Sequence, residues 1–455
     1  MSGPASPAAP PMPSAGAGYP LGQAYAWYVV LVFALAYTCS FLDRQILSLL
    51  VEPIKRDLHL SDTQISLLQG LAFALCNALA GLPLGYLVDT RRRMPIIGVG
   101  IAFWSLATSA CAVARSFAGL LVLRMGVGMG EATLTPAANS VIGDLFPPSK
   151  VGLPLAIYSL GVFAGGGLAL ILGGALIGWL ESLPRVLLPV VGELRPWQAV
   201  FAVLAFPGLL LAVWVFTLRE PPRGAAADFD GPHLTVALRY MADHRWTFLW
   251  LNLSFGVLAM VGYGMAAWAP TFFIRAHGWT AGQIGHAYGL IFMLGGAGGV
   301  VSGGMLGDVL QRRGLRNPRL TVVAVATAAA APFVIAFPVV RTADTGLVLL
   351  AGAVYFSTFV NGLSPALLQQ MVPNQMRGLT VSLSLLAQNL LGLGLGPTLV
   401  ALSTDYLFRD ESRLGLSLSV VTGVLLLTAL LLLRLAYGPY LATRTSIEGR
   451  FARAG

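Results

Sequence analysis

The chain has 455 residues, of which 56% are hydrophobic and only 10% are charged. Soluble domains carry roughly 25% charged residues, so this surface would not keep a folded chain of this length in solution. The composition excludes a soluble globular enzyme, a disordered protein and a nucleic-acid-binding protein, although Lys and Arg outnumber Asp and Glu by 28 to 19. The basic residues lie between long apolar segments, as in the loops of membrane proteins.

The N-terminal residues 1–24 are expected to form a disordered tail. They are uncharged and rich in Ala, Pro and Gly, and they lack the basic and apolar regions of a signal peptide. Cys39, Cys76 and Cys111 all lie in apolar segments. We therefore expect core thiols and no disulfide framework.

Apolar segments of about 20 residues recur after the tail, each long enough to cross ~30 Å of hydrocarbon as a helix. A transmembrane barrel would instead show short segments of alternating polarity. We expect an all-α integral membrane protein with twelve spans, at 27–51, 64–88, 95–114, 117–142, 152–178, 197–217, 246–270, 281–307, 319–340, 346–370, 378–402 and 415–437.

A long polar segment at 218–245 follows the sixth span and divides the chain into two halves. We expect a cytoplasmic linker there, with a short amphipathic helix near 233–243. The predicted units are a six-helix bundle at 25–217, the linker, a second six-helix bundle at 246–437, and a cytoplasmic tail at 438–455.

The basic residues indicate the orientation of the spans. If both termini are cytoplasmic, 17 of the 28 Lys and Arg residues fall inside and 9 outside, while Arg44 and Arg124 lie within spans. Positive charge accumulates on the cytoplasmic side of membrane proteins. This distribution predicts two cytoplasmic termini, and we expect a monomer in a bacterial inner membrane.

An internal repeat supports the division into halves. The segment "GYLVDTRRR" follows the second span and "GMLGDVLQR" follows the eighth, and both read G-x3-D-x3-R at an offset of 219 residues. A second similarity links "FPPSKVG" (146–152) after the fourth span to "VPNQMRG" (372–378) after the tenth. The repeated residues are Gly85, Asp89 and Arg93 in the first half and Gly304, Asp308 and Arg312 in the second.

With this loop the chain resembles transporters of the major facilitator superfamily, whose signature lies between helices 2 and 3 and between helices 8 and 9. The resemblance covers residues 25–437 and implies two pseudo-symmetric six-helix bundles that rock against each other. It assigns Gly85 and Gly304 to close helix approach. It also assigns Asp89, Arg93, Asp308 and Arg312 to a cytoplasmic charge latch, in which each Asp can pair with its Arg or with a helix N-terminus.

A narrower resemblance is to the spinster-like branch. It rests on "FLDRQILSLLVEPIKRDLHLSDTQISLL" (41–68), "RMGVGMGEATLTPAANSVIGDLFP" (124–147) and "WAPTFFIRAHG" (268–278). The branch is associated with export of lysophospholipids and sphingosine phosphate in animals and with proton coupling in bacteria, while related bacterial transporters carry organic acids. The fifth span, "YSLGVFAGGGLALILGG", lacks the Gly-Pro of drug–proton antiporters, which weakens a multidrug interpretation.

Four ionisable residues lie inside the spans, where a charge costs at least ~2.5–3.5 kcal/mol. Asp43 and Arg44 lie in the first span, and Arg124 and Glu131 lie in the fourth. Arg124 and Glu131 are seven residues apart and share a helix face, whereas Asp43 and Arg44 project about 100° apart. One interpretation is a set of structural salt bridges joining helices 1 and 4. The other assigns Asp43 and Glu131 to proton coupling and Arg44 and Arg124 to a substrate anchor, and the roles can coexist.

The four charges sum to zero when all are ionised. Protonating one carboxylate in a low dielectric leaves an unpaired Arg, which favours an anionic ligand. Glu131, the deeper of the two, is preferred as the proton carrier, with Asp43 close behind.

The second half has no charge well inside a span. Its polar and aromatic residues are mainly expected to join helices by hydrogen bonds, and some are expected to line the cavity. The candidates for the cavity are Asn252, Tyr263, Trp268, Tyr355, Asn361, Gln370 and Asn389.

The sequence contains no phosphate-binding loop, nucleophile elbow or metal-ligand spacing, so we expect neither an enzyme nor a cofactor. Three hypotheses remain. The first is a proton-coupled secondary transporter of an amphipathic anionic lipid such as a lysophospholipid. The second is a proton-coupled carrier of a small organic anion or drug, with a wetter cavity. The third, a membrane-embedded enzyme or receptor, lacks the catalytic residues or the large soluble domain it would need.

Overall fold

The computed structural model describes residues 19–147, 149–183, 186–188, 192–223, 234–373 and 376–454, which are almost entirely helical. Most of the predicted N-terminal tail and residues 224–233 of the predicted linker lie outside the described residues. Twelve helical segments are long and apolar enough to cross a membrane, which confirms the predicted number of spans.

The N-terminal half contains the first six spans. They are α1 (Gln23–Gln45) with η1 (Ile46–Ser48); α3 (Asp62–Ser66), η2 (Leu67–Leu71) and α4 (Ala72–Thr90); α5 (Arg93–Cys111); α6 (Phe117–Glu131) with α7 (Leu134–Leu145); α8 (Gly152–Glu181); and α9 (Pro196–Phe216). The short helix α2 (Val51–Leu58) connects the first two spans, and the antiparallel hairpin of β1 (Val186–Leu188) and β2 (Gly192–Leu194) precedes the sixth. The sequence did not predict this hairpin.

The C-terminal half contains the remaining six spans. They are α11 (Arg245–His277); α12 (Ala281–Leu290), η4 (Ile291–Gly295) and α13 (Gly296–Arg312); α14 (Pro318–Ala336); α15 (Ala343–Ser357) with α16 (Phe359–Gln369); α17 (Arg377–Leu402) with η6 (Ser403–Phe408); and η7 (Glu411–Arg413) with α18 (Leu414–Ala454). The amphipathic helix expected near 233–243 is α10 (Leu234–Asp243). Helix α18 continues through the predicted C-terminal tail as far as Ala454.

Polar caps set where several spans begin. Ser61 and Gln64 form a capping box at the start of α3, and Thr280 and Gln283 form the equivalent box at the start of α12. These side chains satisfy backbone N–H groups that have no partner inside the helix. Since α3 and α12 begin the second and eighth spans, the two halves share this local device.

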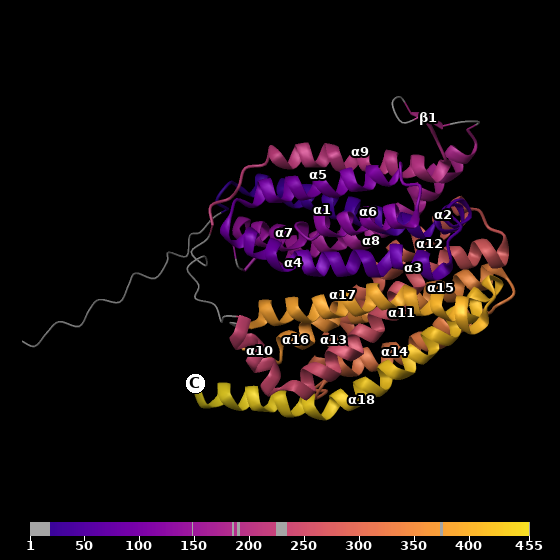
Figure 1. Cartoon of the computed structure of the whole chain (residues 1–455). Helices are drawn as coiled ribbons and strands as arrows, with labels where there is room; N and C mark the ends of the chain where they lie inside the picture. The colour runs from indigo at the N-terminus through magenta and orange to yellow at the C-terminus, as the bar shows by residue number, and fades with distance from the viewer. Residues whose placement is uncertain are drawn as a thin grey trace, which may run out of the picture.

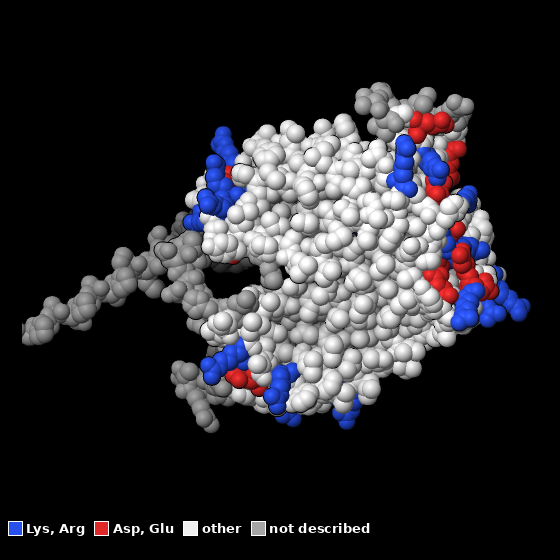
Figure 2. Space-filling view, in the orientation of Figure 1, with Lys and Arg blue, Asp and Glu red and all other residues white. Residues whose placement is uncertain are grey.

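The two halves lie side by side, with most of α1 to α9 above and most of α10 to α18 below in Figure 1, where α12 reaches up to α8. The described ends of the chain lie at the same end of the molecule. Figure 2 shows Lys, Arg, Asp and Glu gathered at the two ends, with a wide uncharged belt between them. When the hydrocarbon of a bilayer surrounds this uncharged belt, the charged residues at the two ends lie in water. A membrane-spanning protein needs this arrangement because charges inside the hydrocarbon are costly.

The halves pack tightly at the end opposite the termini, where glycines bring backbones together. A Cβ on Gly285 of α12 would lie 2.3 Å from the carbonyl oxygen of Leu170 in α8. A Cβ on Gly70 of η2 would lie 2.1 Å from that of Leu393 in α17. At the end that holds the termini, the surface is hollowed between the halves (Figure 2). The molecule is therefore closed at one end and open at the other.

Gly285→Ala tests the backbone contact between α8 and α12. Its methyl group would lie 2.3 Å from a carbonyl oxygen, so we expect a loss of roughly 1–3 kcal/mol of stability, as for other overpacked sites. The same change at Gly262 in α11 meets nothing within 4 Å and is expected to be neutral or to stabilise the helix by up to ~1 kcal/mol. Thermal unfolding of the purified variants measures the difference, and equal melting temperatures would contradict the packing argument.

Candidate functional site

An ion pair between Arg44 of α1 and Glu131 of α6 lies in the N-terminal half. The Arg44 Nε and Nη2 atoms are 2.7 and 2.6 Å from the Glu131 Oε2 atom, which also accepts a hydrogen bond from Ser40 Oγ. The Glu131 side chain is fully buried, whereas 22% of the Arg44 side chain is exposed. The pair therefore combines a carboxylate without access to water and a guanidinium that a ligand can reach.

Aromatic rings surround Arg44. Its guanidinium carbon lies 4.9 Å from the centre of the Phe41 ring and 4.5 Å from that of Phe73, which is the geometry of cation–π contacts. Tyr37 of α1 stacks on Tyr158 of α8 with ring centres 4.6 Å apart. Arg44 thus presents one positive charge within a largely apolar wall.

Asp43 and Arg124 do not form an ion pair with each other or with the first pair. The Asp43 Oδ2 atom accepts a hydrogen bond from Thr108 of α5 at 3.3 Å, and Arg124 donates to the carbonyl oxygens of Asp43 and Leu68 at 3.2 and 3.4 Å. Asp43 Oδ1 and Arg124 Nη2 are buried without a hydrogen-bond partner. The structure brings the four predicted residues together but resolves them into one ion pair and two separate charges.

The C-terminal half contributes polar side chains near this site. Tyr263 of α11 lies near Arg44 and donates a hydrogen bond to the Asn389 side chain of α17 at 3.1 Å. Asn252 accepts from Gln388, Tyr355 donates to Ser302, and Gln370 accepts from Tyr440, so these three predicted cavity residues join helices within their own half.

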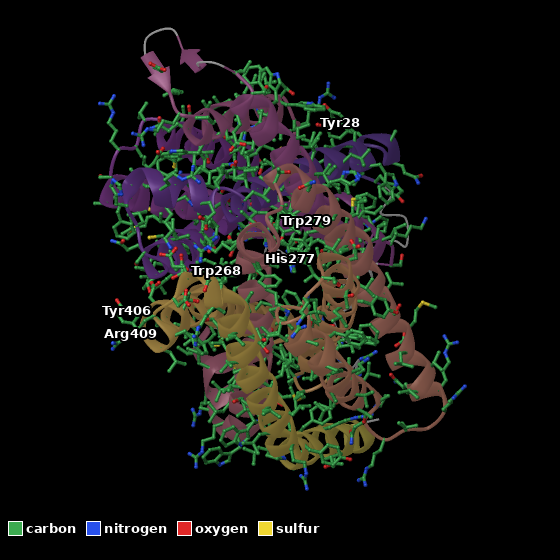
Figure 3. All side chains as sticks on the ribbon, turned by 90° about the vertical axis from the view of Figure 1, so that its right-hand side faces the viewer. Tyr28, Trp268, His277, Trp279, Tyr406 and Arg409 are labelled. Atoms are coloured by element: carbon green, nitrogen blue, oxygen red, sulfur yellow. The ribbon has the colours of Figure 1, made fainter. Side chains whose placement is uncertain are left out.

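Trp268 packs between helices and does not line a cavity. It is fully buried, and its indole Nε1 donates to the carbonyl oxygen of Pro397 at 2.9 Å. Figure 3 labels it in a view from the closed end. The Trp268 side chain can be buried among apolar groups because its one polar atom has a hydrogen-bond partner nearby. Asn361, also predicted to line the cavity, is exposed at α16.

The repeated loop residues have other partners than the sequence predicts. Arg93 is buried and forms ion pairs with Asp144 of α7 and with Glu220, which follows the sixth span, while the Asp89 carboxylate has no ion-pair partner in the part of the chain that the structure describes. Asp308 pairs with Arg319 at 3.5 Å instead of Arg312. Each of these contacts stays within one half, so among the described residues these ion pairs form no latch between the halves at the open end.

The glycines of the repeated loop do not mark close helix contacts in this conformation. A Cβ on Gly85 or on Gly304 would meet nothing within 4 Å. The expectation of close approach at these two positions is therefore wrong for this structure, and the tight contacts lie at the opposite end.

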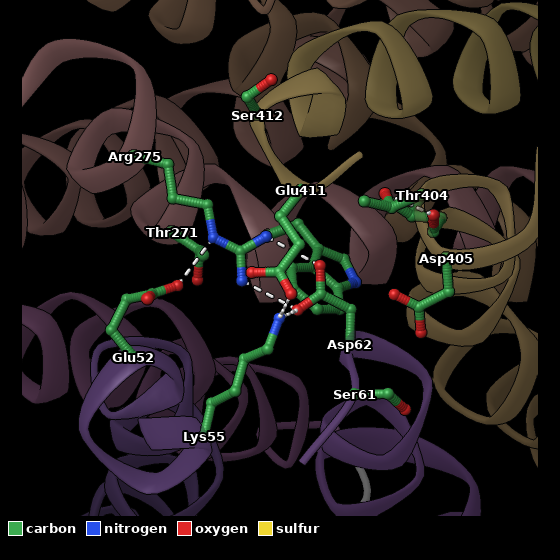
Figure 4. A network of polar contacts seen from close by, with 12 residues as sticks. Glu52, Lys55, Ser61, Asp62, Thr271, Arg275, Thr404, Asp405, Glu411 and Ser412 are labelled. Atoms are coloured by element: carbon green, nitrogen blue, oxygen red, sulfur yellow. Dashed lines mark hydrogen bonds and ion pairs between the residues drawn. The ribbon is translucent and has the colours of Figure 1, made fainter. Parts of the chain in front are cut away.

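Five charged residues form a closing cluster at the end opposite the termini (Figure 4). Arg275, in the last turn of α11, donates to Glu52 at 2.7 Å and to both oxygens of Asp62 at 2.7 and 2.8 Å. Lys55 lies 2.6 Å from Asp62 and 2.8 Å from Glu411. Glu52, Lys55 and Asp62 belong to one half and Arg275 and Glu411 to the other, so the closing cluster joins the halves.

Further hydrogen bonds between the halves lie at the same end. Gln45 donates to the carbonyl oxygen of Ala266 at 2.9 Å, and the Thr63 N–H and hydroxyl both donate to Asp405 at 2.7 Å. The sequence analysis did not predict the closing cluster, because it assigned these charged residues to solvent-exposed loops. Opposite charges at the ends of spans 1, 2, 7 and 12 on one membrane side were the available signal.

Helix α2, which carries Glu52 and Lys55, is fixed to the rest of its half. Asp57 accepts a hydrogen bond from the indole of Trp197 and pairs with Arg195 at 2.5 Å. The hydrogen bond and the charge of Asp57 raise the pKa of Arg195 above its usual value, so the pair favours the charged guanidinium. Two residues of the closing cluster, Glu52 and Lys55, are therefore held in place by the contacts that fix α2.

Comparisons with known proteins agree with this architecture. The family model for the Major Facilitator Superfamily matches residues 33–397. An MFS-type efflux pump of Mycolicibacterium smegmatis is 29% identical over 429 residues, covering 92% of this chain and 94% of that protein. Protein spinster homolog 3 of Danio rerio is 28% identical over 412 residues, covering 86% of this chain and 79% of that protein.

A solved structure is also similar over nearly the whole chain. It is that of a bacterial homologue of the human lysosomal transporter Spinster, in an inward-facing and unoccupied conformation. The TM-score is 0.76 at 28% identity, over 93% of this chain and 98% of that one. The chain therefore belongs to the Major Facilitator Superfamily of membrane transporters and is similar to its spinster members.

Proposed function

We propose that this protein is a proton-coupled secondary transporter that moves an amphipathic anionic lipid, such as a lysophospholipid, by alternating access. The observation that carries the proposal is the ion pair between the buried Glu131 and the partly exposed Arg44. A charge pair in a membrane-spanning bundle is costly, and the exposed part of Arg44 allows a ligand to compete with Glu131 for the guanidinium.

We place both termini in the cytoplasm of a bacterial cell, in its inner membrane. The 17 basic residues on the side of the termini, against 9 on the other side, support this orientation. In this orientation the hollow opens to the cytoplasm and the closing cluster seals the outer side. The described conformation then corresponds to the inward-facing state of the alternating cycle.

Proton binding and anion binding at this site assist each other. While Glu131 is ionised it occupies the Arg44 guanidinium through two nitrogen atoms. A proton on Glu131 removes that attraction, and Arg44 can then bind a phosphate through two parallel hydrogen bonds. Because linkage is reciprocal, a bound anion in turn favours the protonated carboxyl.

The surroundings of Arg44 favour an amphipathic ligand over a small hydrophilic one. The partly exposed Phe41 and Tyr37 offer apolar surface near the charge, and the buried rings of Phe73 and Tyr158 pack behind them. Asp43 is the second candidate for the proton site, but it contacts Thr108 and no guanidinium that a ligand reaches. Glu131 is therefore the preferred proton carrier.

Glu131→Gln is expected to abolish pH-driven accumulation while sparing downhill movement of substrate. The amide cannot release a proton, so substrate flux is no longer tied to the pH gradient.

Arg44→Ala is expected to weaken binding of the phosphate by roughly 10- to 150-fold, which corresponds to the free energy that a hydrogen bond to a charged group contributes. The measurement is uptake of lysophosphatidylglycerol by liposomes that contain the purified protein, with and without a pH gradient.

Asp43→Asn serves as the matched control, because it removes the neighbouring carboxylate. If Glu131→Gln still concentrates substrate with a pH gradient, the assignment of the proton to Glu131 is wrong. If both carboxylate variants do so, neither candidate carries the proton. If organic acids are transported and lysolipids are not, the lipid assignment is wrong. A purely structural salt bridge would instead lower the melting temperature and leave the remaining folded protein pH-driven.

Arg275→Gln is expected to shift the protein toward the state that opens at the closing cluster. The change removes three hydrogen bonds between the halves that exist only while this end is shut. A contribution of ~1–3 kcal/mol corresponds to a 5- to 150-fold change in the ratio of states. In a background without native cysteines, an impermeant maleimide should label Ser48→Cys faster and Asn389→Cys more slowly.

Two further variants sharpen this test. Arg413→Gln lies at the same end but removes only an exposed pair with Asp410 in its own half, so it should change neither labelling rate. Asp89→Asn should shift the ratio the other way, because Asp89 has no ion-pair partner among the described residues here and would gain one only when the cytoplasmic end closes. Unchanged labelling in Arg275→Gln would refute the role of the closing cluster.

A further inference from the structure

An apolar groove of about 750 Å³ lies on the N-terminal half, between α4, α5 and α6. Its volume is within the range of small-molecule sites, roughly 300–1,000 Å³. Leu79 of α4 and Val99 and Phe103 of α5 line it and are 64%, 60% and 48% exposed. It exists because α4 packs on α6 and touches α5 only slightly, although the two helices are consecutive in sequence.

The groove has the length of one leaflet of a bilayer. Along α4 it extends from Cys76 to Leu87, and the eleven steps between these residues span about 16 Å at 1.5 Å per residue. Half of a ~30 Å hydrocarbon core is about 15 Å. It ends near the cytoplasmic side in the orientation proposed above, because Leu87 is three residues before the end of α4.

Two exposed arginines flank the cytoplasmic mouth of the groove. The backbone N–H of Arg91 donates to the carbonyl oxygen of Leu87, which lines the groove, and Arg92 is three residues before Pro95, which also lines it. The Arg91 guanidinium has no ion-pair or hydrogen-bond partner among the described residues, and 83% of the Arg92 side chain is exposed, with only a 3.6 Å contact to Glu220. Figure 2 shows basic residues gathered at this end of the upper half.

The other charges at the mouth leave these two arginines available. Arg93 is already held by Asp144 and Glu220, and Arg223 is held by backbone carbonyl oxygens at the end of α4. Asp89 is the remaining exposed carboxylate. The mouth thus presents two accessible guanidinium groups at the level where the phosphates of a bilayer lie.

We propose that this groove binds an anionic phospholipid of the surrounding bilayer, with one acyl chain between α4 and α5 and the phosphate on Arg91 and Arg92. Burial of the chain covers apolar surface that no protein group covers, and each arginine near an anionic lipid surface strengthens the attraction. The groove lies outside the Arg44–Glu131 site, so the proposal holds whether or not the transport substrate is a lipid. Because α4 carries Phe73 against Arg44, a lipid held there also borders the helix that shapes the transport site.

The test uses liposomes of phosphatidylcholine with a trace of phosphatidylglycerol that carries a photoreactive diazirine on one acyl chain. After irradiation, the labelled residues are located by peptide mass spectrometry. We expect label between Cys76 and Phe103, most of which is lost in Val99→Trp because the indole fills the groove. Val348→Trp, at a site on α15 that is 71% exposed and outside the groove, should leave the labelling intact.

The head-group contact is tested with the double variant Arg91→Gln, Arg92→Gln. We expect about 30-fold weaker binding of phosphatidylglycerol, from the contribution of two arginines near an anionic surface. Arg313→Gln with Arg316→Gln, exposed at the corresponding loop of the other half, is the matched control. All of these positions are exposed, and gel filtration checks that each variant is folded.

Three results would overturn the proposal. Label spread evenly over the lipid-facing helices would show that the groove is not a specific site, as would unchanged labelling in Val99→Trp. Equal labelling by a phosphatidylcholine probe would show that the groove does not select an anionic head group.

Discussion

A carboxylate and a guanidinium that leave water together lose solvation that only their mutual attraction and hydrogen bonds offset. Glu131 and Arg44 meet that requirement at Glu131 Oε2, which takes two short contacts from Arg44 and a hydroxyl donor from Ser40. The other oxygen, Oε1, is buried without a hydrogen-bond partner. The Arg44 side chain remains 22% exposed. Neutralising one partner therefore leaves the other in need of a counter-charge, which links the protonation state to the presence of an anion.

The rest of the molecule is organised so that this pair can face one side of the membrane at a time. At the closed end, backbone contacts at glycines and the closing cluster hold the two halves together. At the end with the termini, the described ion pairs of Arg93 and Asp308 remain within their own halves. In the part of the chain that the structure describes, the ion pairs that join the halves thus lie at one end. Exchanging them for contacts at the other end would open the site to the opposite side of the membrane.

Hydropathy and the repeated loop predicted twelve spans, two halves and four intramembrane charges, because each depends on local sequence and on segment length. The 100° separation of Asp43 and Arg44 left room for them to have different neighbours, and in the structure Asp43 contacts Thr108 while Arg44 pairs with Glu131. The partners themselves depend on helix rotation and tilt in three dimensions. For that reason the sequence missed the contact of Arg93 with Asp144, the burial of Trp268 and the closing cluster around Arg275.

The coupling of one proton to one anion can be measured directly by calorimetry. Lysophosphatidylglycerol is titrated into the purified protein in buffers that differ in ionisation enthalpy, and the dependence of the observed heat on the buffer gives the number of protons taken up. The account predicts uptake approaching about one proton per ligand at a pH where Glu131 is ionised in the free protein, and none in Glu131→Gln. Tight binding without proton uptake, or equal uptake in the variant, would contradict it.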